Sequence, residues 1–421
     1  MHFNLRQTGP IAIALLLSLH LLAPAAAQET PQLPLQEGVP LNAATFATGL
    51  NFPVGLTVLP GGALLVGTSN PTGGSYFSST GELVLLTDEN ADGIADAGPA
   101  VVATGLAGAV TAVAVAGNLV FVTSVASGDE RIQILRGGGD WLGPYELLGE
   151  IIFSFQGFGH QSYGLATRPS SENPDAIELF FNIGARGNDT AGGSVPLGGL
   201  LSGRLPDASI YMTTITDTGD ALELSDPVQI ASGLRNAMAF GFHPETGDLW
   251  ITDNGIDGLE DVWASYSADE LNMIFADQIG GEVEHFGFPT TYTLYDTGEG
   301  VGADGIPPVV AFLPLIGAEN EGVASMVFTP QSFAAPFGSG VLIGFHGQYD
   351  LSGLENEENP LLFVDLETLD VSTIVPPAAP GIGHLDSMTA TEDAIYVADM
   401  CAGSSLAHAQ PCGKIYRITA P

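Results

Sequence analysis

The chain has 421 residues, with 9 Lys and Arg against 48 Asp and Glu and a formal net charge of −39. Hydrophobic residues make up 45% of it, which is enough for a large core and excludes a disordered chain. Nucleic-acid interfaces need clustered Lys and Arg, so this composition excludes nucleic-acid binding. It also excludes attraction to an anionic membrane surface.

The first 27 residues have the organisation of a secretory signal peptide. Arg6 precedes an apolar stretch from Ile11 to Leu22, and Ala25–Ala27 supply the small residues of a cleavage site. The apolar stretch is shorter than the ~20 residues that span a bilayer, which disfavours a transmembrane anchor. We therefore expect cleavage after Ala27 and a mature single domain, residues 28–421, that is secreted or periplasmic.

A two-strand unit recurs six times along the mature chain. Each copy has an apolar strand, a turn rich in Gly, Pro or acidic residues, and a second β-rich strand. The copies span Val54–Gly67, Val110–Val122, Gly164–Asn182, Ala239–Thr252, Ala324–Phe345 and Ser387–Val397. Third strands are predicted after most copies, at Gly81–Leu86, Arg131–Leu135, Leu361–Val364 and Gly413–Ile418.

These repeats predict an all-β fold, a six-bladed β-propeller with very little helix. The 55 Gly and 28 Pro residues agree with many short strands joined by turns. A β-sandwich would not repeat one hairpin six times, and a β-helix would have a much shorter period.

An acidic loop follows the first predicted third strand. Asp88, Asn90, Asp92 and Asp96 place oxygen ligands at positions 1, 3, 5 and 9 of a calcium-binding pattern, with Gly93 at the turn. Position 12 is Pro99, so the bidentate Glu of an EF-hand is missing. The sequence favours a weak calcium site here slightly over a solvated acidic loop.

The fourth repeat and its surroundings carry a family resemblance. The segments that carry it are Gly233–Gly255 (GLRNAMAFGFHPETGDLWITDNG), Asp269–Asn272 (DELN), His285–Pro289 (HFGFP) and His160–Gly187, which contains NIGARG. In this order they resemble the glucose/sorbosone dehydrogenases, exported six-bladed propellers that bind pyrroloquinoline quinone (PQQ) and calcium. The resemblance implies a sugar oxidoreductase that passes electrons to an external acceptor.

The resemblance also assigns roles to individual residues. His160 matches the general base, and an imidazole suits that task because it changes charge near neutral pH. Arg235 matches the guanidinium that polarises the quinone, with Asn236 beside it as a hydrogen-bond partner. Arg186 stands where the family often has Gln, and it is a further candidate for cofactor binding.

Calcium and its supporting residues follow from the same resemblance. The carbonyl groups of Gly255 and Ile256 match two calcium ligands, and oxygen ligands suit this hard cation. Asp269 would support their loop. Two departures from the family pattern stand out. The first is Gly159, which replaces the family's Asp before the base. The second is that the loops at 345–358 and 399–403, which should carry Lys and Arg for the three cofactor carboxylates, contain no cation.

Cys401 and Cys412 are the only two cysteines. In an exported protein we expect them to form a disulfide, whereas two thiols without a nearby His pair are a poor metal site.

Two other functions stay open from the sequence. The first is a propeller that binds a partner without catalysis, because the cations for the cofactor are missing. The second is a calcium-dependent lactonase, for which acids are available but no spacing singles them out; these are Asp253, Asp257, Asp269, Glu321 and Asp386.

Overall fold

The computed structural model describes residues 32–421 apart from short gaps, and within this part of the chain it contains strands and no helix. The gaps are at 72–73, 78–79, 97, 127, 156–158, 161–162, 260–264, 315–321, 348–359, 378, 380, 401–405 and 409–410. The proposed signal peptide therefore lies outside the described residues, as do Glu321 and Cys401.

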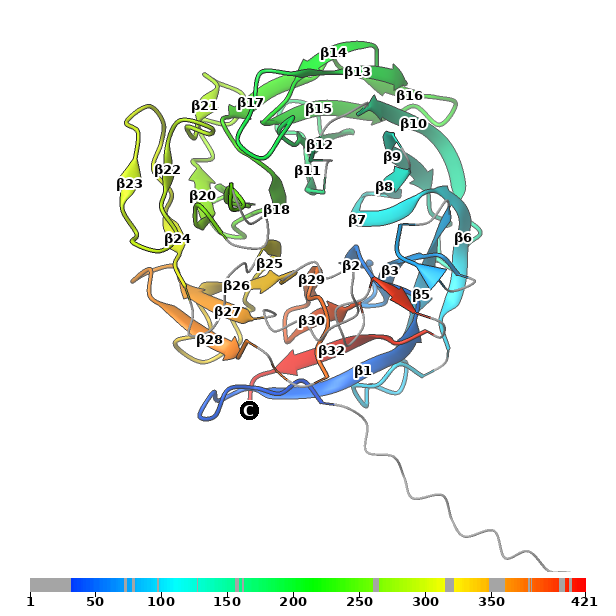
Figure 1. Cartoon of the computed structure of the whole chain (residues 1–421). Helices are drawn as coiled ribbons and strands as arrows, with labels where there is room; N and C mark the ends of the chain where they lie inside the picture. Colours follow the sequence, from blue (N-terminus) through cyan, green and yellow to red (C-terminus); the bar gives the residue numbers. More distant parts are fainter. Residues whose placement is uncertain are drawn as a thin grey trace, which may run out of the picture. The chain divides into compact units, whose positions relative to one another are not determined.

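Antiparallel sheets stand side by side around a central axis (Figure 1). The first three sheets, blades 1 to 3, are built as follows. Blade 1 contains β2 (Leu56–Val58), β3 (Leu64–Ser69), β5 (Thr80–Leu86) and β6 (Ala100–Ala107). Blade 2 contains β7 (Ala109–Ala116), β8 (Leu119–Ala126), β9 (Asp129–Arg136) and β10 (Glu146–Ser154). Blade 3 contains β11 (Leu165–Pro169), β12 (Ala176–Ile183), β15 (Ser209–Asp217) and β17 (Val228–Ser232).

The next three sheets, blades 4 to 6, complete the ring. Blade 4 contains β18 (Ala237–Phe242), β19 (Leu249–Asp253), β20 (Asp269–Ile274) and β24 (Val310–Phe312). Blade 5 contains β25 (Val323–Phe328), β26 (Gly340–Phe345), β27 (Leu361–Asp365) and β28 (Val371–Val375). Blade 6 contains β29 (Ser387–Ala390), β30 (Ala394–Asp399), β32 (Gly413–Thr419) and β1 (Asn42–Leu50).

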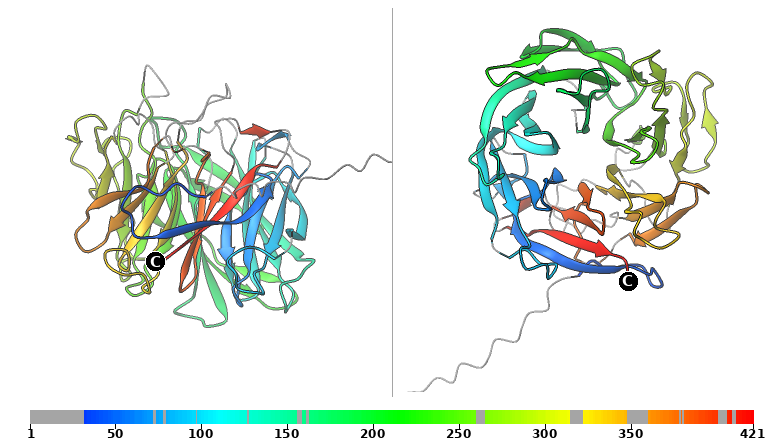
Figure 2. Two further views of the ribbon diagram at one scale, coloured as in Figure 1. Left: turned by 90° about the horizontal axis from the view of Figure 1, so that it is seen from below. Right: turned by 180° about the vertical axis from the view of Figure 1, so that it is seen from behind.

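Each predicted hairpin supplies the first two strands of one blade, so the sequence prediction of a six-bladed propeller is confirmed. The four predicted third strands are also present, as β5, β9, β27 and β32. In the left view of Figure 2 the inner strands run roughly along the axis of the ring, whereas the outer strand β1, in dark blue, runs across it.

Small additional strands decorate the blades. β13 (Ser194–Gly199) and β14 (Gly203–Pro206) extend the outer edge of blade 2, although they follow blade 3's β12 in the chain. β16 (Leu222–Leu224) and β21 (Glu284–His285) add to blade 3. Two short pairs lie apart, β4 (Gly74–Ser75) with β31 (Ala407–His408) and β22 (Tyr292–Thr293) with β23 (Gly300–Val301).

The second strand of each blade is buried along nearly its whole length. This holds for β3, β8, β12, β19, β26 and β30. Both faces of such a strand are covered by neighbouring blades, which explains why its sequence is almost continuously apolar rather than alternating. Six hydrophobic clusters fill the six interfaces between blades, and each buried Leu, Ile or Phe contributes about 1.5–3 kcal/mol.

The ring is closed by pairing between the two ends of the described chain. β1 runs antiparallel to β32 from Asn42 opposite Thr419 to Leu50 opposite Gly413. Phe46 on β1 packs edge-on against Tyr396 on β30, with 5.1 Å between ring centroids. The same cluster includes Leu64 and Val66 of blade 1, so it joins the first and last blades.

We predict that Phe46→Ala lowers the free energy of unfolding by about 3–5 kcal/mol, because it leaves a cavity where the ring closes. Urea denaturation followed by tryptophan fluorescence measures this change. Val371→Ala on the outer strand β28, where Val371 is 42% exposed, is the matched control and should change it by less than about 0.5 kcal/mol. Equal losses for the two variants would contradict the role given to ring closure.

Candidate functional site

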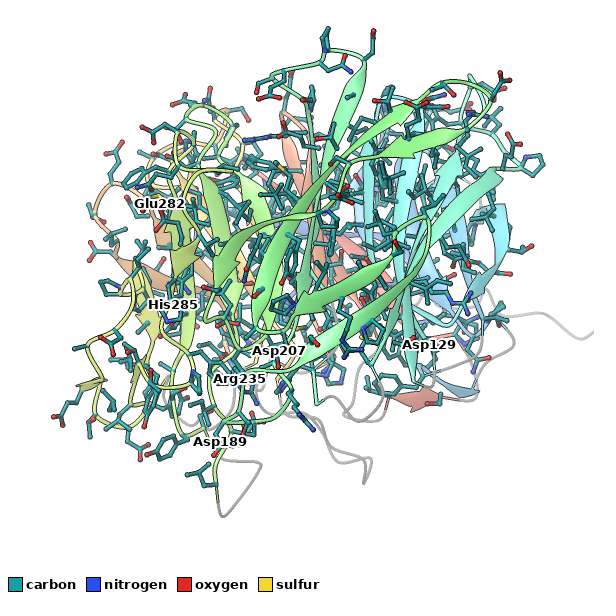
Figure 3. The ribbon with its side chains drawn as sticks, turned by 90° about the horizontal axis from the view of Figure 1, so that it is seen from above. Asp129, Asp189, Asp207, Arg235, Glu282 and His285 are labelled. Atoms are coloured by element: carbon teal, nitrogen blue, oxygen red, sulfur yellow. The ribbon has the colours of Figure 1, made fainter. Side chains whose placement is uncertain are left out.

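A cavity of about 270 Å³ lies where all six blades meet at one end of the axis. In each blade the first strand begins, and the second strand ends, at the same side of the hairpin. These strand ends therefore gather around one opening of the central channel. The contributions of the six blades, in chain order, come from Val54, Thr111, His160, Arg235, Val323 and Asp386. Figure 3 shows Arg235 at the end of the ring where Asp189 and Asp207 also lie, whereas Glu282 lies toward the other end.

A second cavity of about 240 Å³ is lined by the inner strands themselves. It shares Thr111, Tyr163, Met238, Ala324 and Asp386 with the first cavity, so the two adjoin along the axis.

Arg235 is held in a fixed orientation by neighbouring loops. Its Nε donates to the Asn188 carbonyl oxygen at 2.9 Å, and its Nη2 donates to Asn188 Oδ1 at 2.7 Å and to Asp257 Oδ2 at 2.6 Å. The residue is 3% exposed. The fork of guanidinium donors explains why an arginine fits here better than a lysine.

Asp253, at the end of β19, fixes the backbone of the residues that enter the cavity. Its two carboxylate oxygens accept hydrogen bonds from the amides of Arg235, at 2.8 Å, and Asn236, at 2.6 Å. Burial raises the pKa of Asp253 to about 7, against the effect of these hydrogen bonds. The backbone positions of Arg235 and Asn236, just before β18, thus depend on one buried carboxyl group.

Asn236 lines the cavity and is only 6% exposed. Its Nδ2 donates to Asn254 Oδ1 at 3.2 Å and lies 3.1 Å from Met238 Sδ. Its Oδ1 is buried and has no hydrogen-bond partner in the described part of the chain. A buried amide oxygen without a partner costs about 1–3 kcal/mol, which a ligand donor would recover.

His160 lies in the same cavity, before β11. Its Nδ1 lies 3.1 Å from the Ala185 carbonyl oxygen, which can only accept, so Nδ1 carries the proton and Nε2 is an acceptor. This carbonyl orients the imidazole in place of the acid that the sequence lacks at Gly159. Burial, together with the positive charge of Arg235, lowers the pKa of His160 to about 3. The ring is therefore neutral at ordinary pH.

Asp269 connects the predicted calcium loop to blade 5. Its oxygens accept hydrogen bonds from the amides of Gly255, at 2.8 Å, and Val323, at 2.9 Å. A side chain at Gly255 would place its Cβ 2.2 Å from the Ser267 carbonyl oxygen, so this position requires glycine. The Ile256 carbonyl already accepts from the amides of Tyr266 and Ser267 at 2.7 and 3.0 Å. A calcium ion at this carbonyl would have to replace one of these bonds.

The other predicted site residues lie elsewhere. The side chain of Arg186 is exposed and does not line the cavity; its amide donates to Asp207. In the Asp88–Asp96 loop, oxygens of Asp88 and Asn90 accept hydrogen bonds from the amide of Asp92. Within the described ranges no three His, Cys, Asp or Glu side chains are grouped to hold a metal ion. Calcium at either place stays a prediction, as does the disulfide.

A His–Asp pair across the cavity was missed as a functional unit by the sequence analysis. His346 Nδ1 lies 2.9 and 2.8 Å from the two carboxylate oxygens of Asp386. The His384 ring stacks on His346 with centroids 4.0 Å apart. Burial alone would raise the pKa of Asp386, but the contacts with His346 and the nearby His384 outweigh it and lower that pKa. The two residues are 40 positions apart, so only their neighbouring blades bring them together.

The charges around the cavity are almost all negative. Arg235 is the only Lys or Arg among the described lining residues, and it is paired with Asp257. Asp269 and Asp386 add two more carboxyl groups. Five further cations pair with acids or polar groups away from the cavity, namely Arg131, Arg136, Arg168, Arg204 and Arg417. Lys414 donates to the Gly381 carbonyl oxygen.

PQQ carries three carboxylates, and a cavity that binds it needs cations to balance them. One guanidinium, already neutralised by Asp257, faces two further carboxyl groups. Moving a trianion into such a site costs more than the single cation returns. The residues present do not fit this cofactor.

Comparison with solved structures places the fold among known propellers. The holo PQQ domain of pyranose dehydrogenase from Coprinopsis cinerea has a TM-score of 0.60 and 14% identity, covering 93% of this chain and 98% of that one. The PQQ-bound aldose sugar dehydrogenase from Streptomyces coelicolor has a TM-score of 0.54 and 14% identity, covering 90% and 98%. This chain has the propeller fold of these sugar dehydrogenases.

Other comparisons agree on the fold or add little. A calcium structure of a Trichoderma reesei enzyme of carbohydrate-active family AA12 has a TM-score of 0.54 and 15% identity, covering 94% of this chain and 99% of that one. No protein-family model matches the chain. An uncharacterized protein of Borreliella burgdorferi is 28% identical over 142 residues, so the match spans 33% of this chain and 35% of that relative.

No helix capable of crossing a bilayer occurs in the described residues.

A pair of buried acids beneath the cavity predicts how stability depends on pH. Glu270 on β20 lies opposite Asp253 on β19, and burial together with this negative neighbour raises the pKa of Glu270 to about 8. At pH values above the ordinary pKa of Glu, the folded state therefore binds more protons than the unfolded state. The free energy of unfolding should therefore fall as pH rises from about 4.5 to 8.

We predict that Glu270→Gln makes this fall smaller, because a neutral amide has no proton to lose. Urea denaturation at pH 5 and pH 8 measures the difference for each protein. Glu282→Gln, at an exposed position, is the control and should leave the pH dependence unchanged. An unchanged pH dependence in Glu270→Gln would show that this carboxyl group is ionised normally.

Proposed function

We propose that the cavity binds a neutral, polyhydroxylated small molecule of the sugar class, in an oxidoreductase-like propeller. The observation that carries the proposal is the convergence of His160, from the loop before β11, and of Arg235 and Asn236, from the loop before β18, on one small cavity. His160 Nε2 and Asn236 Oδ1 are acceptors for ligand hydroxyl groups, and Arg235 is a donor. Hydrogen-bonding groups of both kinds on one wall suit a sugar, whose hydroxyl groups donate and accept.

Aromatic side chains on another part of the wall support the same ligand class. Tyr76 and Phe77 line the cavity, with ring centroids 5.1 Å apart, and Phe77 is 50% exposed. Such rings offer apolar faces for the C–H faces of a sugar. The sugar dehydrogenases that share the fold support this choice of ligand.

The charge of the cavity supports a neutral ligand over an anionic one. An acidic sugar would meet the same carboxyl groups that disfavour PQQ. Oxidation of the sugar by a quinone, with His160 as base, is what the sequence resemblance predicts, and the charge of the cavity disfavours that cofactor. Export of the protein is also part of the proposal. It is supported by the signal-peptide pattern of residues 1–27.

Calorimetric titration with glucose, other neutral aldoses and glucuronate tests the ligand class. We expect neutral aldoses to bind and glucuronate to bind at least about tenfold more weakly, since about 1.4 kcal/mol of charge repulsion is enough for that factor. Arg235→Lys should weaken aldose binding, because lysine cannot reproduce the fork to Asn188 and Asp257.

The matched control is Arg204→Lys on β14, at the outer edge of blade 2, where Arg204 is bonded to Ser194 and does not line the cavity. It should bind aldoses as the unaltered protein does. Asn236→Ala provides a second cavity variant if Arg235→Lys does not fold. Absence of binding by every neutral sugar in the panel would reject the proposal and favour a propeller that binds another kind of partner.

Titration with PQQ in the presence of calcium is a separate prediction. We expect no saturable binding at tens of micromolar cofactor, because the described cavity offers one neutralised cation to three carboxylates. Quenching of tryptophan fluorescence at physiological ionic strength, where repulsion from the rest of the acidic surface is largely screened, measures it. Saturable binding there would overturn the charge argument and restore the quinoprotein activity.

A further inference from the structure

Two cavities adjoin along the axis of the ring and have nearly the same volume. The first, of about 270 Å³, is lined by Arg235 and Asn236, and the second, of about 240 Å³, lies among the first strands of the blades. Cavities that bind small molecules commonly measure about 300–1,000 Å³. Each cavity alone falls below this range, whereas the two together fall within it.

The lining residues show that one ligand can reach both cavities. Five residues contribute to both walls, and they belong to five different blades; these are Thr111, Tyr163, Met238, Ala324 and Asp386. Because these residues surround the junction, the second cavity continues the first and is not a separate pocket. A ligand beside Arg235 can therefore extend along the axis into the second cavity.

Backbone groups give the second cavity a polar wall. All six blades line it with their first strands, each of which is the edge of its sheet; these strands are β2, β7, β11, β18, β25 and β29 (Figure 1). An edge strand has a hydrogen-bonding neighbour on one side only. On its other side, alternate N–H and C=O groups are left for solvent or for a ligand. Sugar hydroxyl groups both donate and accept, so they match both kinds of backbone group.

The side chains of the second cavity favour a neutral ligand. Asp386 and Tyr163 are the only ionisable side chains in its described lining, which contains no Lys, Arg or His. An anion would therefore meet no cation there. The carboxylate of Asp386 is already engaged, since both of its oxygens lie within 2.9 Å of His346 Nδ1.

We propose that the two cavities form one extended site for a neutral disaccharide, or for the end of a longer unbranched oligosaccharide. The terminal sugar ring occupies the second cavity, among the first strands. The next ring lies beside Arg235 and Asn236 in the first cavity, from which a longer chain leaves through the mouth. The proposal rests on the proposed binding of a sugar, and it specifies the length of that sugar.

Calorimetric titration of the full-length protein with glucose, maltose and cellobiose tests the proposal. We expect at least one of the two disaccharides to bind at least about tenfold more tightly than glucose, because its second ring fills the second cavity. Two disaccharides are used because they differ in linkage, and the junction between the cavities constrains the angle between the rings.

Ala239→Leu fills part of the second cavity without altering the lining of the first. Ala239 lies half-buried on β18 and lines the second cavity only. We expect this variant to bind the disaccharide no more tightly than glucose, while its affinity for glucose stays unchanged. Thr57→Leu on β2, which also lines only the second cavity, makes the same test from blade 1 if Ala239→Leu does not fold.

The matched control is Ala44→Leu on the outer strand β1. Ala44 is exposed and lines neither cavity, so the same change of side chain should leave the preference for the disaccharide intact. An equal loss of preference in Ala44→Leu would overturn the assignment. A preference that persists in both Ala239→Leu and Thr57→Leu would also overturn it, because the second ring would then bind outside the second cavity.

The extended site and the proposed function can fail separately. If glucose binds and neither disaccharide binds more tightly, the extended site is rejected and the proposed function stands. If no sugar of either size binds, the proposed function is rejected and the extended site with it. Binding of a disaccharide alone, lost in Ala239→Leu, would support both.

Discussion

Closure of the ring is the constraint on which the rest of the structure depends. Each blade buries the two faces of its second strand only because another blade lies on either side. A ring with one open interface would expose the clusters that now fill it. The pairing of β1 with β32 removes that opening by joining strands from opposite ends of the chain. Once closed, the ring fixes the distance between loops that lie far apart in the sequence.

The cavity is a consequence of that closure rather than of any one segment. Inner strands start at the mouth and second strands end there, so each blade delivers two loop positions. Arg235, Asp257 and Asp269 come from blade 4, His160 from the entry to blade 3, and His346 from blade 5. Antiparallel pairing gives this arrangement to any chain with six such hairpins. The chemistry depends on which residues stand at those positions.

The scarcity of cations has the largest chemical consequence. The chain has nine Lys and Arg residues, and eight of them lie in the described region. Only Arg235 reaches the cavity, and Asp257 neutralises it. The fold is shared with proteins whose solved structures contain PQQ, yet the electrostatics of this cavity oppose a trianion. Fold and ligand therefore separate here, because backbone geometry survives changes in surface charge that a charged ligand does not tolerate.

The sequence alone determined the six hairpins, four of the third strands and the acidic balance, because local patterns of apolar residues and turn formers specify strands directly. It also singled out His160, Arg235, Asn236 and Asp269 through short motifs, and the fold brings all four to one cavity. Only the tertiary structure placed Arg186 outside that cavity, gave His160 a carbonyl partner and paired His346 with Asp386. Such contacts join residues of different loops, and no local pattern encodes the distance between blades that the closed ring sets.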